Sequence, residues 1–303
     1  MRQIIQGQKI TWVDIQDPTQ DDVNFLKQEL NLPQTALEEL IPQGHGPRIE
    51  CRQEYLFITL YYPMHSAEKR ETRSRELDII VTKETVVTSH YRSIVPLKSL
   101  FDNCNLYQEN KQKYLQENTG ILLFYILSEF WKNCQTKLIR IDKRMNQIER
   151  NIFKGKEKEM VVEISYVKTD IINFWRIIDP QKEVLDSLIA KTKEFFGHGV
   201  GSYLADAKSA YSQTRNTLQT YRETILALEK TNESLLSTKT NEIIKILTIF
   251  SVIMLPLGFI ANLWGMNVPL PLIENENGFL VIAGIMIIMV AFMFIYFKKK
   301  RWL

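Results

Sequence analysis

Seven residues near the C-terminus follow a helical spacing and include groups that can interact with a cation. Steps of three and four residues define a polar face made of Asn241, Ile244, Thr248, Ser251, Leu255, Gly258 and Asn262. The opposite faces are apolar, with residues such as Leu247, Phe250 and Ile260. Polar side chains in a membrane helix face partner helices or water. The polar face therefore predicts either tight helix packing through small residues or a pore lined by several copies of this helix, whose amide and backbone groups meet hydrated cations.

The polar face lies within the first of two long apolar runs. Residues 246 to 263 and 279 to 297 contain no charged residue, and each run is long enough to cross the hydrocarbon core of a bilayer. A buried hairpin in a soluble core is the alternative. We predict a first span at 243–264, a connection at 265–278 and a second span at 279–297. The connection begins with Gly265-Met266-Asn267, and its only charged residues are Glu274 and Glu276.

The charges next to the apolar runs predict how the chain crosses the membrane. A basic cluster follows the second run within the predicted tail 298–303, and it consists of Lys298, Lys299, Lys300 and Arg301. Lys239 and Lys245 precede the first run. Positive residues collect on the cytoplasmic side of membrane proteins. We therefore expect a multi-pass protein of the cell (inner) membrane with both termini in the cytoplasm, an external connection and the lipid bilayer as partner.

The residues before the first span predict a soluble part in two regions. Residues 1–110 alternate strand patterns with two short helix patterns, which indicates an α+β cytoplasmic domain. "KITWVDIQ" is one such strand, and "ELDIIVTKETVVTSHY" predicts two strands that form a hairpin with its turn at 82–85. Residues 111–242 have apolar residues at helical spacing, with breaks at 154–156 and 197–199, and form a predicted long-helix stalk. Between residues 202 and 255 there is no glycine or proline, so we expect one long helix that continues into the membrane.

Composition makes several other classes of protein improbable. The net charge of +3 is too small to indicate a nucleic-acid partner, and the three widely spaced cysteines form no zinc or disulfide pattern. The four histidines (His45, His65, His90 and His198) are far apart in sequence. "FKGKEKE" lacks the upstream glycine and the Ser or Thr of a phosphate-binding loop. We expect neither an enzyme nor a covalent cofactor.

The motif after the first span, together with its position, resembles the signature of a known family. The CorA-type divalent metal ion transporters carry Gly-Met-Asn at the outer end of the first of two C-terminal spans, and here the motif is Gly265-Met266-Asn267. The stretches "KTNEIIKILTIFSVIMLPLGFI", "GPRIECRQEYLFITL" and "KKKRWL" are also similar to the family. The resemblance extends from about Thr11 to the end of the chain and is loosest in the middle.

The resemblance implies a fold, an assembly and roles for the motif. The fold is an α+β cytoplasmic domain followed by a long α-helical stalk and two C-terminal transmembrane helices, assembled into a funnel-shaped homopentamer. The first span at 243–264 would line the pore. Asn267 would bind a hydrated cation at its external mouth, and Gly265 and Met266 would shape that mouth. Glu274 and Glu276 would concentrate cations there, although both also fit a solvated loop. The basic cluster of the tail would form a collar at the cytoplasmic membrane level.

The same resemblance implies passive transport of a divalent cation. Mg²⁺ is the expected ion, with Co²⁺ or Ni²⁺ as further cargo, since a neutral amide ring suits an ion that dehydrates reluctantly. A Zn²⁺ transporter of the same fold and a membrane-anchored scaffold that conducts nothing remain as alternatives. The sequence departs from the family at Leu255, Gly258 and Asn262, where Met, Thr and Gly are expected, and this leaves the ion preference open.

Regulation by cytoplasmic Mg²⁺ is expected to be weak. Asp206 falls where the family places a metal-sensing aspartate, and Glu54 stands next to Gln53 in place of a more acidic pair. Lys132 and Asn133 occupy a position where aspartates are expected, and a lysine repels a divalent cation. Mg²⁺ is thus the expected transported ion and only a candidate regulatory ligand.

Overall fold

The structure is a computed structural model that describes residues 1–30, 33–41, 44, 46–66, 71–115, 117–197, 199–266 and 278–302. Contacts divide the chain into two compact units, Met1–Lys230 and Thr231–Leu303. One helix, α8, contributes residues to both units.

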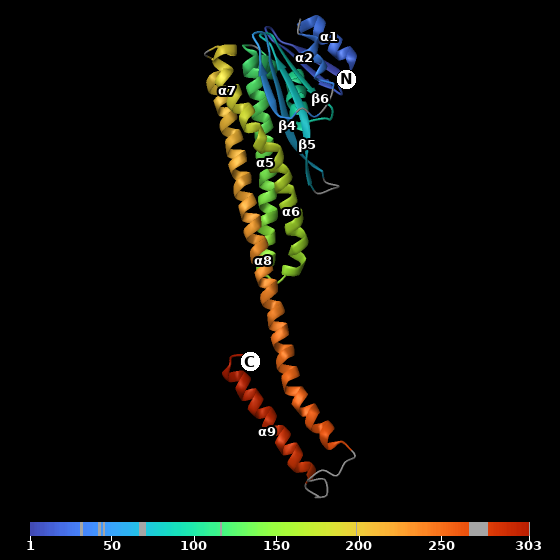
Figure 1. Ribbon diagram of the computed structural model, residues 1–303. Coiled ribbons are helices and arrows are strands. Elements are labelled where there is room, and N and C mark those ends of the chain that lie inside the picture. The colour runs from blue at the N-terminus through green and yellow to red at the C-terminus, as the bar shows by residue number, and fades with distance from the viewer. Residues whose placement is uncertain are drawn as a thin grey trace. The chain divides into compact units, whose positions relative to one another are not determined.

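The first unit is built on a six-stranded mixed sheet with the order β1-β2-β6-β5-β4-β3 (Figure 1). Its strands are β1 (Arg2–Gln6), β2 (Thr11–Gln16), β3 (Arg48–Cys51), β4 (Leu56–Ser66), β5 (Glu71–Val81) and β6 (Thr85–His90). Neighbouring strands are antiparallel except β2 and β6, which run parallel. The predicted hairpin of β5 and β6 is present, and Thr82 closes its turn because its backbone N–H donates to the Thr85 carbonyl at 2.8 Å.

Helices cover both faces of this sheet. They are α1 (Gln20–Leu30), α2 (Gln34–Glu38), α3 (Val95–Leu106), α4 (Gln108–Leu115), α5 (Thr119–Phe153), α6 (Glu157–Ile178) and α7 (Lys182–Phe196). On one face, Val23 and Leu26 of α1 and Leu37 of α2 share a buried core with Val13 and Phe57 of the sheet. On the other face α6 packs against β4 and β5. Contacts group the sheet and α5 to α7 into one compact unit, and the division into regions at 1–110 and 111–242 stays a prediction.

The predicted breaks between the long helices coincide with glycines in the left-handed region. Gly155, with φ of 83°, follows α5, and Gly197, with φ of 77°, follows α7. An L side chain rarely adopts such angles, which explains why a glycine ends each helix. A third break, the 3₁₀-helix Asp179–Gln181, separates α6 from α7 where the sequence had suggested a continuous pattern, and it contains Pro180.

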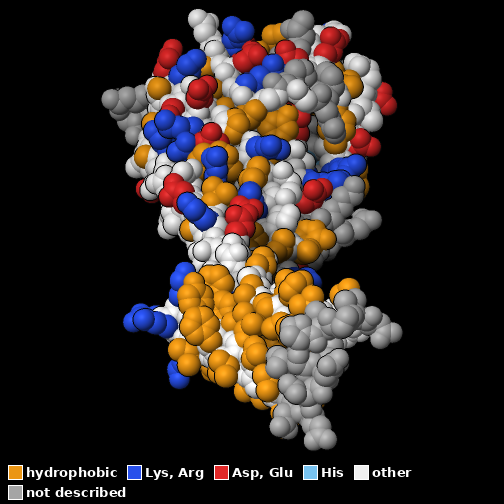
Figure 2. Space-filling view, turned by 60° about the horizontal axis from the view of Figure 1, so that its bottom comes forward, with side chains coloured by type: hydrophobic (Ala, Val, Ile, Leu, Met, Phe, Trp, Pro, Cys, Tyr) orange, Lys and Arg blue, Asp and Glu red, His pale blue; other side chains and the backbone are white. Residues whose placement is uncertain are grey.

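The second unit consists of apolar helices that its own fold does not bury. The described helices here are the last part of α8 (Gly201–Trp264) and α9 (Gly278–Lys299), and both are long and apolar enough to cross a membrane. Their exposed surface is mostly hydrophobic (Figure 2), with large exposed fractions at Phe259, Phe279 and Ile288. A surface of this kind is stable in lipid rather than in water. The α+β domain, long helix and two C-terminal apolar helices expected from the sequence are confirmed.

Candidate functional site

The polar face of α8 is solvent-exposed in the chain. All seven of its residues lie within α8; Ser251 is half-buried, and the other six are exposed. Thr248 donates its hydroxyl hydrogen to the carbonyl oxygen of Ile244 at 2.7 Å, so its hydroxyl oxygen remains free to accept. The side-chain amides of Asn241 and Asn262 form no hydrogen bond with any other described residue. Two amides and a hydroxyl oxygen are thus available to an ion, to water or to another helix.

The contact between α8 and α9 uses a different side of α8. The Lys245 ammonium lies 3.3 Å from the carbonyl oxygen of Arg301, and both Ile249 and Phe297 are buried at this end of the unit. At 100° per residue, the polar-face residues lie on average roughly 130° around the helix from Ile249. Packing within the chain's own hairpin therefore does not explain the polar face. Either another copy of the chain or water must cover it.

The first two residues of the Gly-Met-Asn motif lie directly after the end of α8. The backbone N–H of Gly265 donates to the carbonyl oxygen of Ala261 at 2.9 Å. A Cβ atom at Gly265 would lie only 3.1 Å from that same oxygen. Glycine avoids this close contact at the end of the helix. Met266 is exposed. Asn267, Glu274 and Glu276 lie outside the described residues.

The basic cluster at the other end of the hairpin is held by a defined helix stop. Arg301 has φ of 57°, and its backbone N–H donates to the Lys298 carbonyl at 3.1 Å. The backbone N–H of Trp302 donates to the Phe297 carbonyl at 3.0 Å, and the Trp302 ring stacks on that of Phe297. These bonds and the ring contact form a Schellman motif. The motif fixes the end of α9, from which the cationic side chains extend.

The residues considered for metal sensing do not form a metal site with other described residues of the same chain. Asp206 is exposed on α8, and Glu54 is exposed in the turn between β3 and β4. The described residues contain no group of three or more His, Cys, Asp or Glu side chains that could hold a metal ion. Asn133 accepts a hydrogen bond from the hydroxyl of Tyr62, so its amide already has a structural partner.

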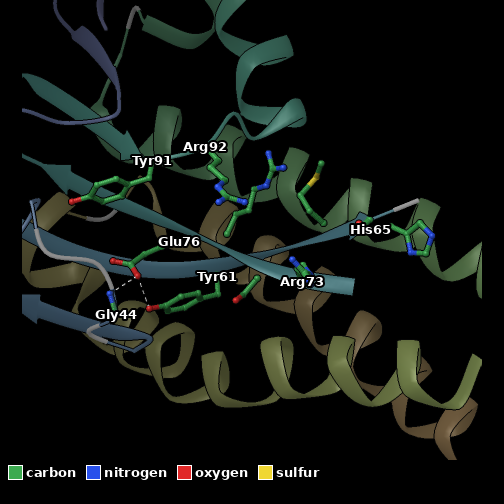
Figure 3. A pocket seen from close by; sticks show the side chains of 11 residues that line it. Gly44, Tyr61, His65, Arg73, Glu76, Tyr91 and Arg92 are labelled. Carbon is green, nitrogen blue, oxygen red and sulfur yellow. Dashed lines mark hydrogen bonds between the residues drawn. The ribbon is translucent and has the colours of Figure 1, made fainter. Parts of the chain in front are cut away.

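Sequence reasoning missed a concentration of arginines on the first unit. Arg73 and Arg75 lie two residues apart on β5 and Arg92 follows β6, and all three line one pocket (Figure 3). The alternation of Arg73 and Arg75 was visible in the sequence, because residues two apart on a strand share a face. The predicted hairpin also indicated Arg92, because the register that pairs Val81 with Val86 and Asp78 with Ser89 brings position 92 opposite Arg75 when it is extended.

Comparison with known sequences matches nearly the whole chain to one protein family. The family described as CorA-like Mg²⁺ transporter protein matches residues 7–299. The cobalt/magnesium transport protein CorA of Thermotoga maritima is 26% identical over 296 residues, which cover 97% of this chain and 83% of that protein. The protein of the same description from Methanocaldococcus jannaschii is 22% identical over 97% of this chain and 92% of its own length.

Solved structures share the fold at low sequence identity. The complete structure of the CorA magnesium transporter from Methanocaldococcus jannaschii superposes with a TM-score of 0.84 at 21% identity, covering 99% of this chain and 93% of that one. The cytoplasmic domain of ZntB from Vibrio parahaemolyticus gives a TM-score of 0.63 at 11% identity over 77% of this chain and 90% of that one. Because the family match spans both the sheet and the two membrane helices, the chain belongs to the CorA-like Mg²⁺ transporter family, whose members are membrane transporters rather than enzymes.

Proposed function

We propose that the chain assembles as a homopentamer that conducts divalent cations passively across the membrane, with Mg²⁺ as the main ion. The polar face of α8 lines the pathway, and Gly265, Met266 and Asn267 form its external mouth. The observation that carries the proposal is the position of this face, which lies away from the hairpin contact of its own chain and ends just before the motif. Two helices cannot enclose much water, so several copies of α8 must contribute.

The chemistry of the polar face and mouth suits a hydrated ion. Mg²⁺ dehydrates reluctantly and usually keeps several of its waters. Amide oxygens of Asn267 and Asn262 and the hydroxyl oxygen of Thr248 accept hydrogen bonds from such waters without adding charge. A neutral pathway of this kind holds the ion weakly enough to release it, as conduction requires.

Charged residues at the two ends complete the proposed pathway. Glu274 and Glu276 in the external connection would be repeated around the assembly and would raise the local concentration of cations. Lys298, Lys299, Lys300 and Arg301 would form a basic collar at the cytoplasmic surface, which orients the chain in the inner membrane with both termini inside. The lysines also set an electrostatic barrier that ions must pass to enter the cytoplasm.

The membrane potential is sufficient as a driving force. An inside-negative potential contributes about 2.3 kcal/mol per elementary charge per 100 mV, and about twice that for a divalent ion. Neither ATP nor a proton gradient is then required, and Mg²⁺ acts as cargo rather than as a resident cofactor.

Ion flux into liposomes that contain the purified protein tests this function. Uptake of Mg²⁺, Co²⁺, Ni²⁺ and Zn²⁺ is measured separately, each with and without a proton gradient. We expect Mg²⁺ uptake without the gradient, and uptake of Co²⁺ or Ni²⁺ in the same conditions. Uptake of Zn²⁺ alone would assign the chain as a zinc transporter of the same fold. Absence of uptake for every ion would indicate a scaffold that conducts nothing.

Cytoplasmic Mg²⁺ is expected to regulate this flux only weakly. Asp206 and Glu54 are exposed and form no metal cluster with other residues that the structure describes. Lys132 adds a positive charge where the family is expected to have aspartates. We therefore expect Asp206→Ala to conduct like the unmodified protein at both low and millimolar Mg²⁺ on the cytoplasmic side. The measurement is Mg²⁺ flux as a function of that concentration. Closure by millimolar Mg²⁺ that Asp206→Ala abolishes would refute the expectation.

A further inference from the structure

A pocket of about 530 Å³ lies on the first unit, along β4, β5 and the segment that follows β6 (Figure 3). Its size falls within the range of small-molecule sites, which is roughly 300–1,000 Å³. A second hollow of about 480 Å³ shares Arg73, Ser74 and Arg92 with it and adds Arg176 of α6. The two hollows together form a basic pocket, named here for its four arginines Arg73, Arg75, Arg92 and Arg176.

Three of the four arginines of the basic pocket form no ion pair with a described carboxylate. Arg73 pairs with Glu71, with its Nε atom 2.9 Å from the carboxylate. In contrast, no carboxylate among the described residues forms an ion pair with Arg75, Arg92 or Arg176. Arg75 donates instead to the carbonyl oxygen of Ser93, and burial together with the nearby charge of Arg92 lowers its pKa. Guanidinium groups that form no ion pair with any described carboxylate offer a site for an anionic ligand.

The other end of the same pocket carries a carboxylate, Glu76, and therefore calls for a hydrogen-bond donor rather than an anion. Glu76 accepts hydrogen bonds at one carboxylate oxygen from the Tyr61 hydroxyl at 2.7 Å and from the Gly44 backbone N–H at 2.8 Å. Burial and the neighbouring Glu76 raise the pKa of Tyr61, which keeps this hydroxyl protonated as a donor. The second oxygen of Glu76 is buried and has no hydrogen-bond partner in the part of the chain that the structure describes. A buried carboxylate oxygen without a donor is uncommon, and a ligand N–H or O–H group would satisfy it.

The two ends are separated along the pocket. Figure 3 shows Glu76 with Tyr61 and Tyr91 toward one side, Arg92 centrally and Arg73 toward the other. The tyrosine rings offer aromatic surface at the end where Glu76 lies. A ligand that matches this arrangement is an anion at one end, and carries hydrogen-bond donors and a flat ring at the other.

We propose that the basic pocket binds a nucleotide, with its phosphates on Arg75 and Arg92 and a donor group of its sugar or base on the free oxygen of Glu76. Arginine forks match phosphate oxygens in pairs and favour phosphate over a simple halide. The inference does not depend on ion conduction, because binding is measured without flux.

Isothermal titration calorimetry on the full chain in detergent tests the phosphate end. ADP and inorganic pyrophosphate are titrated with divalent ions chelated, so that cargo sites stay empty. We expect both to bind, and we expect Arg92→Gln to raise the dissociation constant of each by about tenfold or more, since hydrogen bonds to charged groups are the stronger ones. Arg92 is exposed and unpaired with any described carboxylate, so its replacement should leave the fold intact. Absence of binding, or binding unchanged in Arg92→Gln, would overturn the proposal.

A charge-matched control separates a built site from general attraction. Arg52 and Lys98 are exposed and lie outside the basic pocket, so the double variant Arg52→Gln/Lys98→Gln changes the net charge as much as Arg75→Gln/Arg92→Gln. Only the second pair should weaken binding. An equal loss in both would mean that the protein attracts anions non-specifically, and the site would be rejected.

Glu76→Gln tests the other end of the ligand. We expect weaker ADP binding because the amide cannot offer two acceptor oxygens, while pyrophosphate, which has no donor group for Glu76, should bind as before or slightly more tightly. A loss of pyrophosphate binding in Glu76→Gln, or unchanged ADP binding, would contradict the assignment of a nucleotide.

Discussion

Asn267→Ala is expected to lower Mg²⁺ flux by about tenfold or more while the assembly stays intact, because each subunit then loses a hydrogen bond to the hydrated ion at the mouth. In the proposed pentamer all five amides disappear together. Alanine leaves no polar atom in their place, so an ion arriving with its water shell finds no acceptor. The measurement is initial Mg²⁺ uptake into liposomes, with the oligomer checked by light scattering in detergent.

The same substitution elsewhere in the external connection provides the control. Asn277 carries an identical amide in this connection but lies ten residues beyond the motif. Asn277→Ala should change flux by less than about twofold, since surface substitutions away from a site have small effects. Flux in Asn267→Ala equal to that of the unmodified protein would remove Asn267 from the ion pathway.

Gly258→Leu is expected to block the pathway without harming the chain. Apart from the backbone of its own helix turn, a Cβ atom at Gly258 would meet nothing within 4 Å, so the fold of a single chain accepts a side chain there. If polar faces of several copies surround the pore, however, every copy places a leucine in it, and an apolar constriction of that kind excludes water. Because ions cannot pass where water is excluded, we expect Mg²⁺ flux to fall by about tenfold or more.

Gly284 offers a matched comparison on the other membrane helix. A Cβ atom at Gly284 of α9 also meets nothing within 4 Å, but α9 carries no polar face. Gly284→Leu should therefore assemble and conduct within about twofold of the unmodified protein, because an apolar side chain facing lipid costs little. Normal conduction by Gly258→Leu, or an equal loss in Gly284→Leu, would show that the polar face does not line the pathway.

Sequence patterns predicted the helices and strands that are determined by their own stretch of sequence. The hairpin of β5 and β6, the long helix α8 and the two apolar runs follow from periodicity and from the absence of breakers. Strands β1 and β3 were missed, and they are the two edge strands of the sheet. Both are short, and β3 has no fully buried residue, so their pairing is set by neighbours rather than by an alternating pattern of their own.

The same holds for the candidate sites: a site within one helix could be predicted, and a site built from several elements could be predicted less well. The polar face of α8 was predictable because its seven residues share one helix, whose geometry fixes their common side. The basic pocket was predictable only in part, because Arg176 of α6 joins the arginines of β5 and of the segment after β6 only when α6 packs on the sheet. The stop at Arg301 was also unforeseen, since a left-handed residue after a helix is usually a glycine.

The most direct test of passive divalent-cation conduction is Mg²⁺ uptake as a function of membrane potential. Liposomes that contain the purified protein, without ATP or a proton gradient, receive a potassium diffusion potential of either sign. We predict that uptake rises steeply as the inside becomes negative, because each 100 mV adds about 4.6 kcal/mol for a divalent ion, and that it falls when the potential is reversed. Uptake that ignores the potential, or that requires ATP or a proton gradient, would contradict the proposed mechanism.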